Sequence, residues 1–204
     1  MSSTRSRLVL GLSLVIGTAA VTAEAQVGTG WTQYAFTVTR VHREGSGAAY
    51  SKSGGIETFT VPTGAKRSEI QMGPNWKSGQ RQFQGEVNTK AGSGGSGGSS
   101  VVQVFGIADR NSDAFQLRVV DASGGSYRSQ TDHNPNIVVA TGVYGKWTRV
   151  NVIHDANANR LSCYINGSLK FSGVDGGNAN HYFKYGMYIR PGQSQWRSVK
   201  TFRK

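Results

Sequence analysis

Residues 182–190 read Tyr-Phe-Lys-Tyr-Gly-Met-Tyr-Ile-Arg, the clearest stretch of alternating side-chain character in the chain. Successive side chains of a β-strand point to opposite faces. The odd positions predict an apolar face for the core: Phe183, Tyr185, Met187 and Ile189. The even positions place phenols and cations around Gly186: Tyr182, Lys184, Tyr188 and Arg190. We expect Gly186 to leave room for a ligand, so the stretch predicts a strand with one buried face and one binding face.

The same period of two recurs in short runs along the chain after residue 26, while helical periodicity is nearly absent. The predicted strands are 32–41, 56–60, 66–73, 82–89, 101–108, 114–121, 136–140, 146–154, 160–166, 168–173, 182–190 and 196–203. A dozen strands without intervening helices imply antiparallel sheets. The predicted fold class is therefore all-β, a single-domain β-sandwich or jelly roll.

Residues 1–25 have the pattern of a secretory signal peptide. Arg5 and Arg7 precede an apolar run, and Ala23-Glu24-Ala25 is a small-x-small cleavage signal. The apolar run is short for a membrane anchor, the alternative interpretation. We therefore expect a secreted protein whose single domain spans 26–204.

Composition excludes several classes of protein. The chain has 204 residues and a formal charge of +12, with one cysteine, Cys163. A single cysteine excludes an internal disulfide scaffold and a multi-cysteine metal site. The basic excess favours an anionic partner, or serves solubility alone. No block of five basic residues and no basic helical stripe occurs, so we expect neither nucleic acid nor a membrane as partner, and we expect a monomer.

Two further strands carry candidate binding residues. Arg67, Glu69 and Gln71 share one strand face, where the fork of an arginine can bind a carboxylate at two points. A structural ion pair is the alternative interpretation of Arg67 and Glu69. Gln103 lies among apolar residues and needs a partner or a ligand.

The Gly/Ser-rich stretch 92–100 and Cys163 give two structural expectations. The stretch predicts a mobile connection between strands, either a flap over a groove or a hairpin tip. Cys163 shares a strand face with Leu161 and Ile165, which predicts a buried, inert thiol.

Three segments together resemble the signature strands of the alginate-lyase-like jelly-roll polysaccharide lyases, namely family 7 and the related glucuronan lyases. They are RSEIQM at 67–72, QVF at 103–105 and YFKYGMYIR at 182–190. The family patterns are R-[ST]-E-[LV]-R, Q-[IV]-H and Y-F-K-x-G-x-Y-x-Q. Residues 146–150 and 164–167 also resemble the sandwiches of the concanavalin A-like lectins and glucanases, which bears on the fold and not on the reaction.

The resemblance implies a secreted lyase that cleaves an acidic polyuronate, glucuronan-like or alginate-like, by β-elimination without a metal or other cofactor. It implies Tyr188 as the acid, and as the base too when both reacting groups lie on one side of the sugar. It also implies Arg67 and Gln103 on the substrate carboxylate, and Lys184 as a supporting cation. We add Glu69, Gln71, Tyr182 and Arg190 to the substrate-binding set. Two positions depart from the patterns: Phe105 replaces the family's histidine and Arg190 replaces its final glutamine.

The histidine that the family uses as a base is therefore missing, and His42 is the residue that we expect to replace it. His133 lies in a polar stretch that could reach a groove, and any histidine taken singly is more often an ordinary surface residue. The main alternative function is a non-catalytic carbohydrate-binding jelly roll that binds acidic polysaccharide. A structural or wall-associated basic protein is a further alternative. A glycosidase is disfavoured because few carboxylates lie inside predicted strands.

Overall fold

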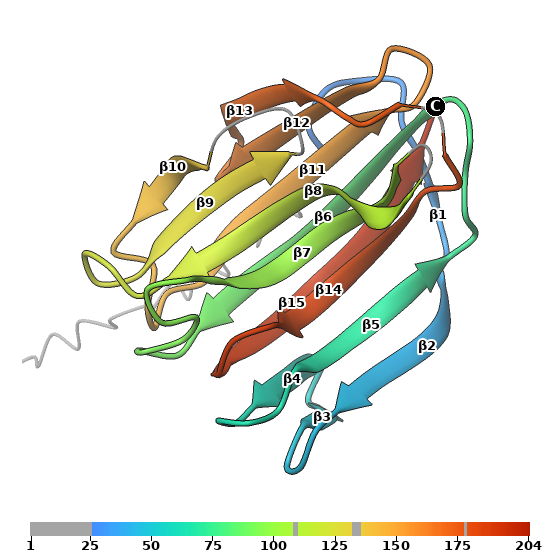
Figure 1. The fold of residues 1–204 in the computed structure, drawn as a ribbon. Helices are drawn as coiled ribbons and strands as arrows, with labels where there is room; N and C mark the ends of the chain where they lie inside the picture. Colours follow the sequence, from blue (N-terminus) through green and yellow to red (C-terminus); the bar gives the residue numbers. More distant parts are fainter. Residues whose placement is uncertain (1–25, 108–109, 132–135, 178) are drawn as a thin grey trace, which may run out of the picture.

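The computed structural model describes residues 26–107, 110–131, 136–177 and 179–204, which fold into two antiparallel sheets (Figure 1). The first sheet has eight strands, in the order β13 (Ser168–Val174), β12 (Arg160–Ile165), β11 (Thr148–Asp155), β6 (Gln80–Thr89), β15 (Gly192–Arg203), β4 (Ile56–Val61) and β3 (Ala49–Ser53), with β1 (Thr32–Tyr34) also paired to β15. The second has seven strands, in the order β10 (Ile137–Thr141), β9 (Ser126–Thr131), β8 (Arg110–Val120), β7 (Ser99–Ile107), β14 (Tyr182–Tyr188), β5 (Arg67–Gly73) and β2 (Thr37–Glu44).

The core lies between the two sheets and is rich in aromatic rings. The ring centre of Phe83 on β6 lies 5.8 Å from those of Phe183 and Tyr185 on β14, and 5.5 Å from that of Trp196. All four side chains are buried. Burying such large apolar side chains supplies most of the driving force for holding two sheets together. The Tyr185 hydroxyl donates a hydrogen bond to Glu57 at 2.6 Å, so its polar end is satisfied.

The predicted all-β sandwich is confirmed, and each predicted strand has a counterpart in the structure. Three details differ. The run predicted at 32–41 is divided into β1 and β2. The sequence analysis missed β3 and β9, because polar residues such as Ser, Lys and Arg interrupt their alternation.

The Gly/Ser-rich stretch, expected from its composition to be a mobile connection, is packed against the fold. Ser93 is buried, and its carbonyl accepts a hydrogen bond of 2.8 Å from the Tyr144 hydroxyl. The amide of Gly94 donates to Pro191, and Arg118 donates to the carbonyls of Gly97 and Gly98 at 2.5 and 2.8 Å. Ser99 and Ser100 already belong to β7.

Cys163 on β12 is a buried thiol, as predicted. Its neighbours Leu161 and Ile165 are buried on the same strand face. Burial raises the pKa of the thiol to about 12. Among the described residues, no helix has the length and the apolar character needed to cross a membrane. The predicted signal peptide at 1–25 and His133 lie outside the described residues.

Candidate functional site

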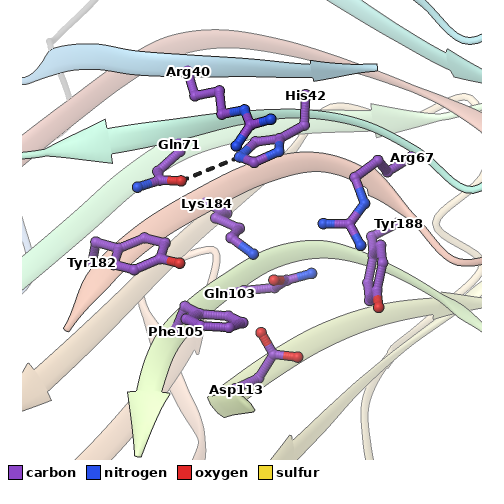
Figure 2. Close-up of a pocket in the computed structure, with 10 residues that line it drawn as sticks. All are labelled: Arg40, His42, Arg67, Gln71, Gln103, Phe105, Asp113, Tyr182, Lys184 and Tyr188. Carbon is purple, nitrogen blue, oxygen red and sulfur yellow. Dashed lines mark hydrogen bonds between the residues drawn. The ribbon is translucent and has the colours of Figure 1, made fainter. Parts of the chain in front are cut away.

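A pocket of about 310 Å³ opens on the outer face of the seven-stranded sheet, away from the core (Figure 2). Five neighbouring strands contribute its lining: Arg40 and His42 from β2, Arg67 and Gln71 from β5, Gln103 and Phe105 from β7, Asp113 from β8, and Tyr182, Lys184 and Tyr188 from β14. Seven of the nine predicted site residues line it. The other two, Glu69 and Arg190, are placed elsewhere.

Strand pairing explains why these residues meet. In the β14–β5 pair, Tyr188 lies opposite Arg67 and Lys184 lies opposite Gln71. On the other side of β14, Lys184 lies opposite Gln103. Directly opposed residues on neighbouring strands have side chains on the same face, so the pairing alone gathers the set.

Gly186 does not leave room for a ligand, which corrects that expectation. A Cβ at Gly186 would lie 2.4 Å from the carbonyl oxygen of Ser68 and 3.0 Å from the core ring of Phe59. The residue has φ of 139° where the β14–β7 register shifts, so a backbone irregularity and close packing require glycine here. Beyond this irregularity Tyr188 still faces the pocket.

The predicted alternation ends at Tyr188. Ile189 has a φ of 83° and is 44% exposed, so its predicted place in the core is wrong. Arg190 follows outside the strand and packs its guanidinium against Gly97, away from the pocket lining. The left-handed conformation of Ile189 turns the chain, which a pattern of residue types cannot reveal.

Arg67 is held by acidic groups and by an aromatic ring. Its Nε lies 2.9 Å from a carboxylate oxygen of Glu44, and its Nη1 lies 3.9 Å from Oε2 of Glu69. Its guanidinium carbon lies 4.6 Å from the ring centre of Tyr188. These contacts orient the guanidinium beside the phenol, where it can donate hydrogen bonds to a ligand's carboxylate.

Glu69 lies beneath the pocket together with Gln103. Glu69 is 1% exposed, and its Oε1 accepts a hydrogen bond of 3.0 Å from Nε2 of Gln103. Burial raises the pKa of Glu69 to about 7, although Lys184 and Arg67 act in the opposite direction. The remaining oxygens, Oε2 of Glu69 and Oε1 of Gln103, are buried without a hydrogen-bond partner among the described residues. Such orphaned acceptors are uncommon, and a ligand hydroxyl at Gln103 would satisfy one of them.

His42 lies across the pocket from Tyr188, with its Nε2 3.2 Å from Oε1 of Gln71 (Figure 2). Burial lowers the pKa of His42 below its ordinary value of 6.5, and the cations Lys184, Arg40 and Arg67 lower it further. A neutral imidazole at ordinary pH can accept a proton.

Lys184 lies against two aromatic rings, and one of them, Phe105, stands where the family pattern has histidine. Its Nζ lies 3.9 Å from the ring centre of Phe105 and 5.7 Å from that of Tyr182. The two rings stack at 5.1 Å with an angle of 26° between their planes. Phe105 thus replaces the family's histidine with a cation–π contact that holds the ammonium group. Burial lowers the pKa of Lys184, and burial also raises the pKa of Tyr182 to about 12.

The sequence analysis missed two pocket residues, Arg40 and Asp113. Arg40 lies on β2, where the alternation of exposed and buried residues does not define a buried face. Asp113 lies opposite Phe105 in the β7–β8 pair, and β8 begins four residues before its predicted start at 114. Arg40, Arg67 and Lys184 give the lining more positive than negative charge, which favours an anionic ligand.

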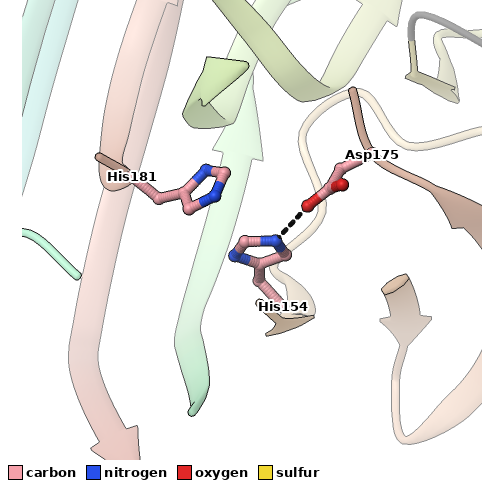
Figure 3. A group of neighbouring side chains, drawn as sticks. All are labelled: His154, Asp175 and His181. Atoms are coloured by element: carbon pink, nitrogen blue, oxygen red, sulfur yellow. Dashed lines mark hydrogen bonds and ion pairs between the residues drawn. The ribbon is translucent and has the colours of Figure 1, made fainter. Parts of the chain in front are cut away.

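A second cluster lies buried away from the pocket and joins His154, Asp175 and His181 (Figure 3). His154 and His181 are at most 1% exposed, so the expectation of ordinary surface histidines is wrong for both. The Trp76 indole donates to Nδ1 of His154 at 3.0 Å, so the proton of a neutral imidazole lies on Nε2. That Nε2 lies 2.5 Å from Oδ2 of Asp175, to which it donates. Both nitrogens of His154 are thus used within the protein, so this cluster fits a structural hydrogen-bond chain better than a metal site.

Comparison with known proteins places these features in context. No protein-family model matches the chain. A citrate-binding protein from Hevea brasiliensis is 38% identical over 144 residues, which cover 67% of this chain and 56% of that protein. The chain thus spans little more than half the length of that curated relative.

Solved structures of alginate lyases share the architecture. An alginate lyase from Pseudomonas aeruginosa has a TM-score of 0.64 at 13% identity, covering 76% of this chain and 86% of that one. The marine family 7 alginate lyase AlyA1 from Zobellia galactanivorans has a TM-score of 0.64 at 13% identity, covering 85% of this chain and 95% of that one. At these identities the likeness concerns the fold. The chain therefore has the β-jelly-roll fold of the family 7 alginate lyases.

Proposed function

We propose that the chain is a polysaccharide lyase that binds an acidic polyuronate, glucuronan-like or alginate-like, and cleaves it by β-elimination. The observation that carries this proposal is the convergence of Arg67, Gln103, Tyr188 and His42 in one cationic pocket. The fold shared with the alginate lyases supports the same reaction class.

The reaction makes three demands on the pocket. The carboxylate on carbon 5 of the sugar must be neutralised, so that the charge that develops on it is stabilised. A base must remove the proton on carbon 5, and an acid must protonate the oxygen that leaves carbon 4. The electron pair of the broken C–H bond then forms the C4–C5 double bond as the C4–O bond breaks.

The residues present divide these tasks. Arg67 binds the carboxylate, with Lys184 adding positive potential and Gln103 offering its amide. His42, whose pKa is lowered by burial, is the base, and the Tyr188 hydroxyl is the acid. Tyr182 and Gln71 bind the sugar beside them. No cofactor enters this scheme.

A second candidate function is carboxylate binding without cleavage. Two observations favour it: Phe105 occupies the position of the family's histidine, and the relative from Hevea brasiliensis is named for binding citrate. The cationic lining suits a tricarboxylate as well as a uronate. In this alternative the pocket binds a carboxylate ligand but does not catalyse β-elimination.

Turnover separates the two functions. Residues 26–204 are incubated with glucuronan, alginate and polygalacturonate while the ultraviolet absorbance of the unsaturated uronate product is followed. We expect the absorbance to rise with at least one polymer. Calorimetric binding of uronate oligomers or citrate without any rise would support the non-catalytic function and overturn the lyase.

Arg67→Ala tests the pocket in either case. We expect the variant to lose about 3 kcal/mol of transition-state stabilisation, roughly a hundredfold in kcat/KM, by analogy with lost oxyanion donors. Arg160→Ala is the matched control, because it removes an exposed arginine from the other sheet. Equal effects of the two substitutions would exclude Arg67 from the site.

The proposal includes secretion through the signal peptide at 1–25. Expression in a secreting host and mass spectrometry of the product test it. We expect a chain that begins at Gln26, and retention of residues 1–25 on the exported protein would contradict cleavage.

A further inference from the structure

Two rows of polar side chains begin at the pocket and cross the seven-stranded sheet. One row consists of residues opposed to one another on successive strands: Arg67, Tyr188, Ser100, Arg118 and Arg128. The parallel row is rich in amides: Gln71, Lys184, Gln103, Gln116 and Gln130. Each row runs from β5 through β14, β7 and β8 to β9, perpendicular to the strands.

The first row ends in an unusual pair of like charges. Arg118 and Arg128 are directly opposed on β8 and β9, and the half-buried side chains share the outer face. Like charges at opposed positions destabilise a sheet. Among the described residues, neither arginine forms an ion pair, and Nε of Arg128 is buried without a hydrogen-bond partner.

A third arginine approaches the same place from the loop after β14. The guanidinium of Arg190 packs against Gly97, whose carbonyl accepts a hydrogen bond of 2.5 Å from Arg118. Burial lowers the pKa of Arg118, repulsion from Arg190 adds to that effect, and attraction to Asp113 acts in the opposite direction. Arg118 and Arg190 thus meet at the Gly/Ser-rich turn, and Arg128 lies opposite Arg118 on the neighbouring strand, so an anionic group bound among these cations would offset their charge.

The separation from the pocket bears on the kind of ligand. Arg67 and Arg118 are three strand spacings apart in the row, which corresponds to about 14 Å between the strands. This strand separation exceeds the length of a small tricarboxylate, whereas a chain of linked sugars can span it. Tyr188 and Ser100 lie between them in the row, and the Ser100 hydroxyl donates to Gln116 of the parallel row at 2.6 Å.

We propose that Arg118, Arg128 and Arg190 form a second anion subsite, which binds a further carboxylate of a polyuronate whose first carboxylate is bound at Arg67. This inference rests on the proposed function, because it requires a polymeric acidic ligand. It predicts that the protein binds longer oligomers more tightly, through residues outside the pocket. It also gives Arg190 a binding role at a position away from Tyr188 and Lys184.

Oligomer length provides the test. Calorimetry at low ionic strength measures the binding of oligoglucuronates, from the dimer to the octamer, to the Tyr188→Phe protein, in which cleavage is expected to be at least about a hundredfold slower. Arg128→Gln is the informative added substitution, because Arg118 also holds the loop through Gly97 and Gly98. We expect it to weaken octamer binding about tenfold, the effect of losing a hydrogen bond to a charged group, and to leave dimer binding unchanged. Arg160→Gln on the other sheet is the charge-matched control, and Arg128→Lys should restore most of the affinity.

The outcomes separate this inference from the proposed function. Octamer binding that is unchanged in Arg128→Gln but weakened in Arg67→Ala would overturn the second subsite and leave the pocket intact. Equal weakening of dimer and octamer by Arg128→Gln would also overturn it. If neither oligomer binds before Arg128 is changed and citrate does, both the polyuronate and the second subsite are wrong.

Discussion

The guanidinium of Arg67 lies over the ring of Tyr188, with 4.6 Å between the guanidinium carbon and the ring centre, and the two residues are directly opposed on β5 and β14. The group proposed to bind the substrate carboxylate therefore packs against the group proposed to protonate the leaving oxygen. Under the proposed function, a carboxylate bound at Arg67 would bring the scissile bond next to the phenol, so the same contact would serve binding and orientation.

Tyr188→Phe removes the hydroxyl and keeps the ring on which Arg67 packs. We expect kcat to fall at least about a hundredfold, the usual contribution of a general acid, with little change in the thermal midpoint. The rise of product absorbance measures turnover, and circular dichroism follows unfolding. Tyr164→Phe, on the other sheet, is the control. Turnover at the original rate would exclude Tyr188 as the acid.

Phe105→His restores the residue of the family pattern at the position where the ring contacts Lys184. The imidazole adds a second base to the pocket opposite Asp113. We expect a gain of turnover on alginate, measured by product absorbance. Phe105→Leu is the control, because it removes the ring without adding a base. A gain in the leucine variant equal to that in the histidine variant would show that the imidazole is not responsible.

The pH dependence of turnover should report His42. Burial and neighbouring cations lower its pKa from 6.5, so the imidazole stays neutral and able to accept a proton until the pH falls below that value. We expect kcat to stay constant between pH 8 and 6.5 and to fall at lower pH. His42→Gln should remove this acidic decrease in kcat and should also lower kcat at every pH. An acidic descent of the same shape in the glutamine variant would assign it to another group.

Stability should respond to pH through Glu69. Burial raises its pKa to about 7 in the folded protein, against 4.5 for an unperturbed glutamate, so between these values the folded chain binds a proton that the unfolded chain has lost. The contribution of this group to stability is present below pH 4.5 and is lost as the pH rises to 7. Glu69→Gln keeps an acceptor for Gln103, and we expect it to raise the free energy of unfolding at pH 7.5 by about 2 kcal/mol.

Urea unfolding at several pH values measures the effect of Glu69→Gln. Glu86→Gln is its control, since it removes a half-exposed carboxylate that pairs with Arg197 on the other sheet. A stability difference between Glu69→Gln and the parent protein that is constant from pH 4.5 to 7.5 would contradict the raised pKa.

Much of the site could be predicted from the sequence because strands impose a period of two. Once β5 and β14 were recognised, alternation assigned Arg67 and Lys184 to a polar face, and Gln103 on β7 stood out as a polar residue among apolar ones. Strand pairing then brings these side chains together in the pocket, since each lies opposite another pocket residue on the neighbouring strand. Alternation failed where the backbone departs from an extended conformation, at Gly186 and Ile189.

Other features depend on contacts between distant segments. Asp113 and Arg40 enter the pocket because β8 and β2 flank the recognised strands, an order of strands that local patterns do not encode. The Gly/Ser-rich turn was expected to be mobile from its composition. Its carbonyls are instead bound by Arg118 and Tyr144, which lie far along the chain.

The burial of Cys163 has a practical consequence. Because this thiol is shielded between the sheets and scarcely ionised, dyes that attack thiolates should not modify it in the native protein. A cysteine introduced at the exposed Ser96, in the turn beside the arginines, would then be the one reactive position. A fluorophore attached there could report the arrival of a sugar chain in real time, without replacement of the native cysteine.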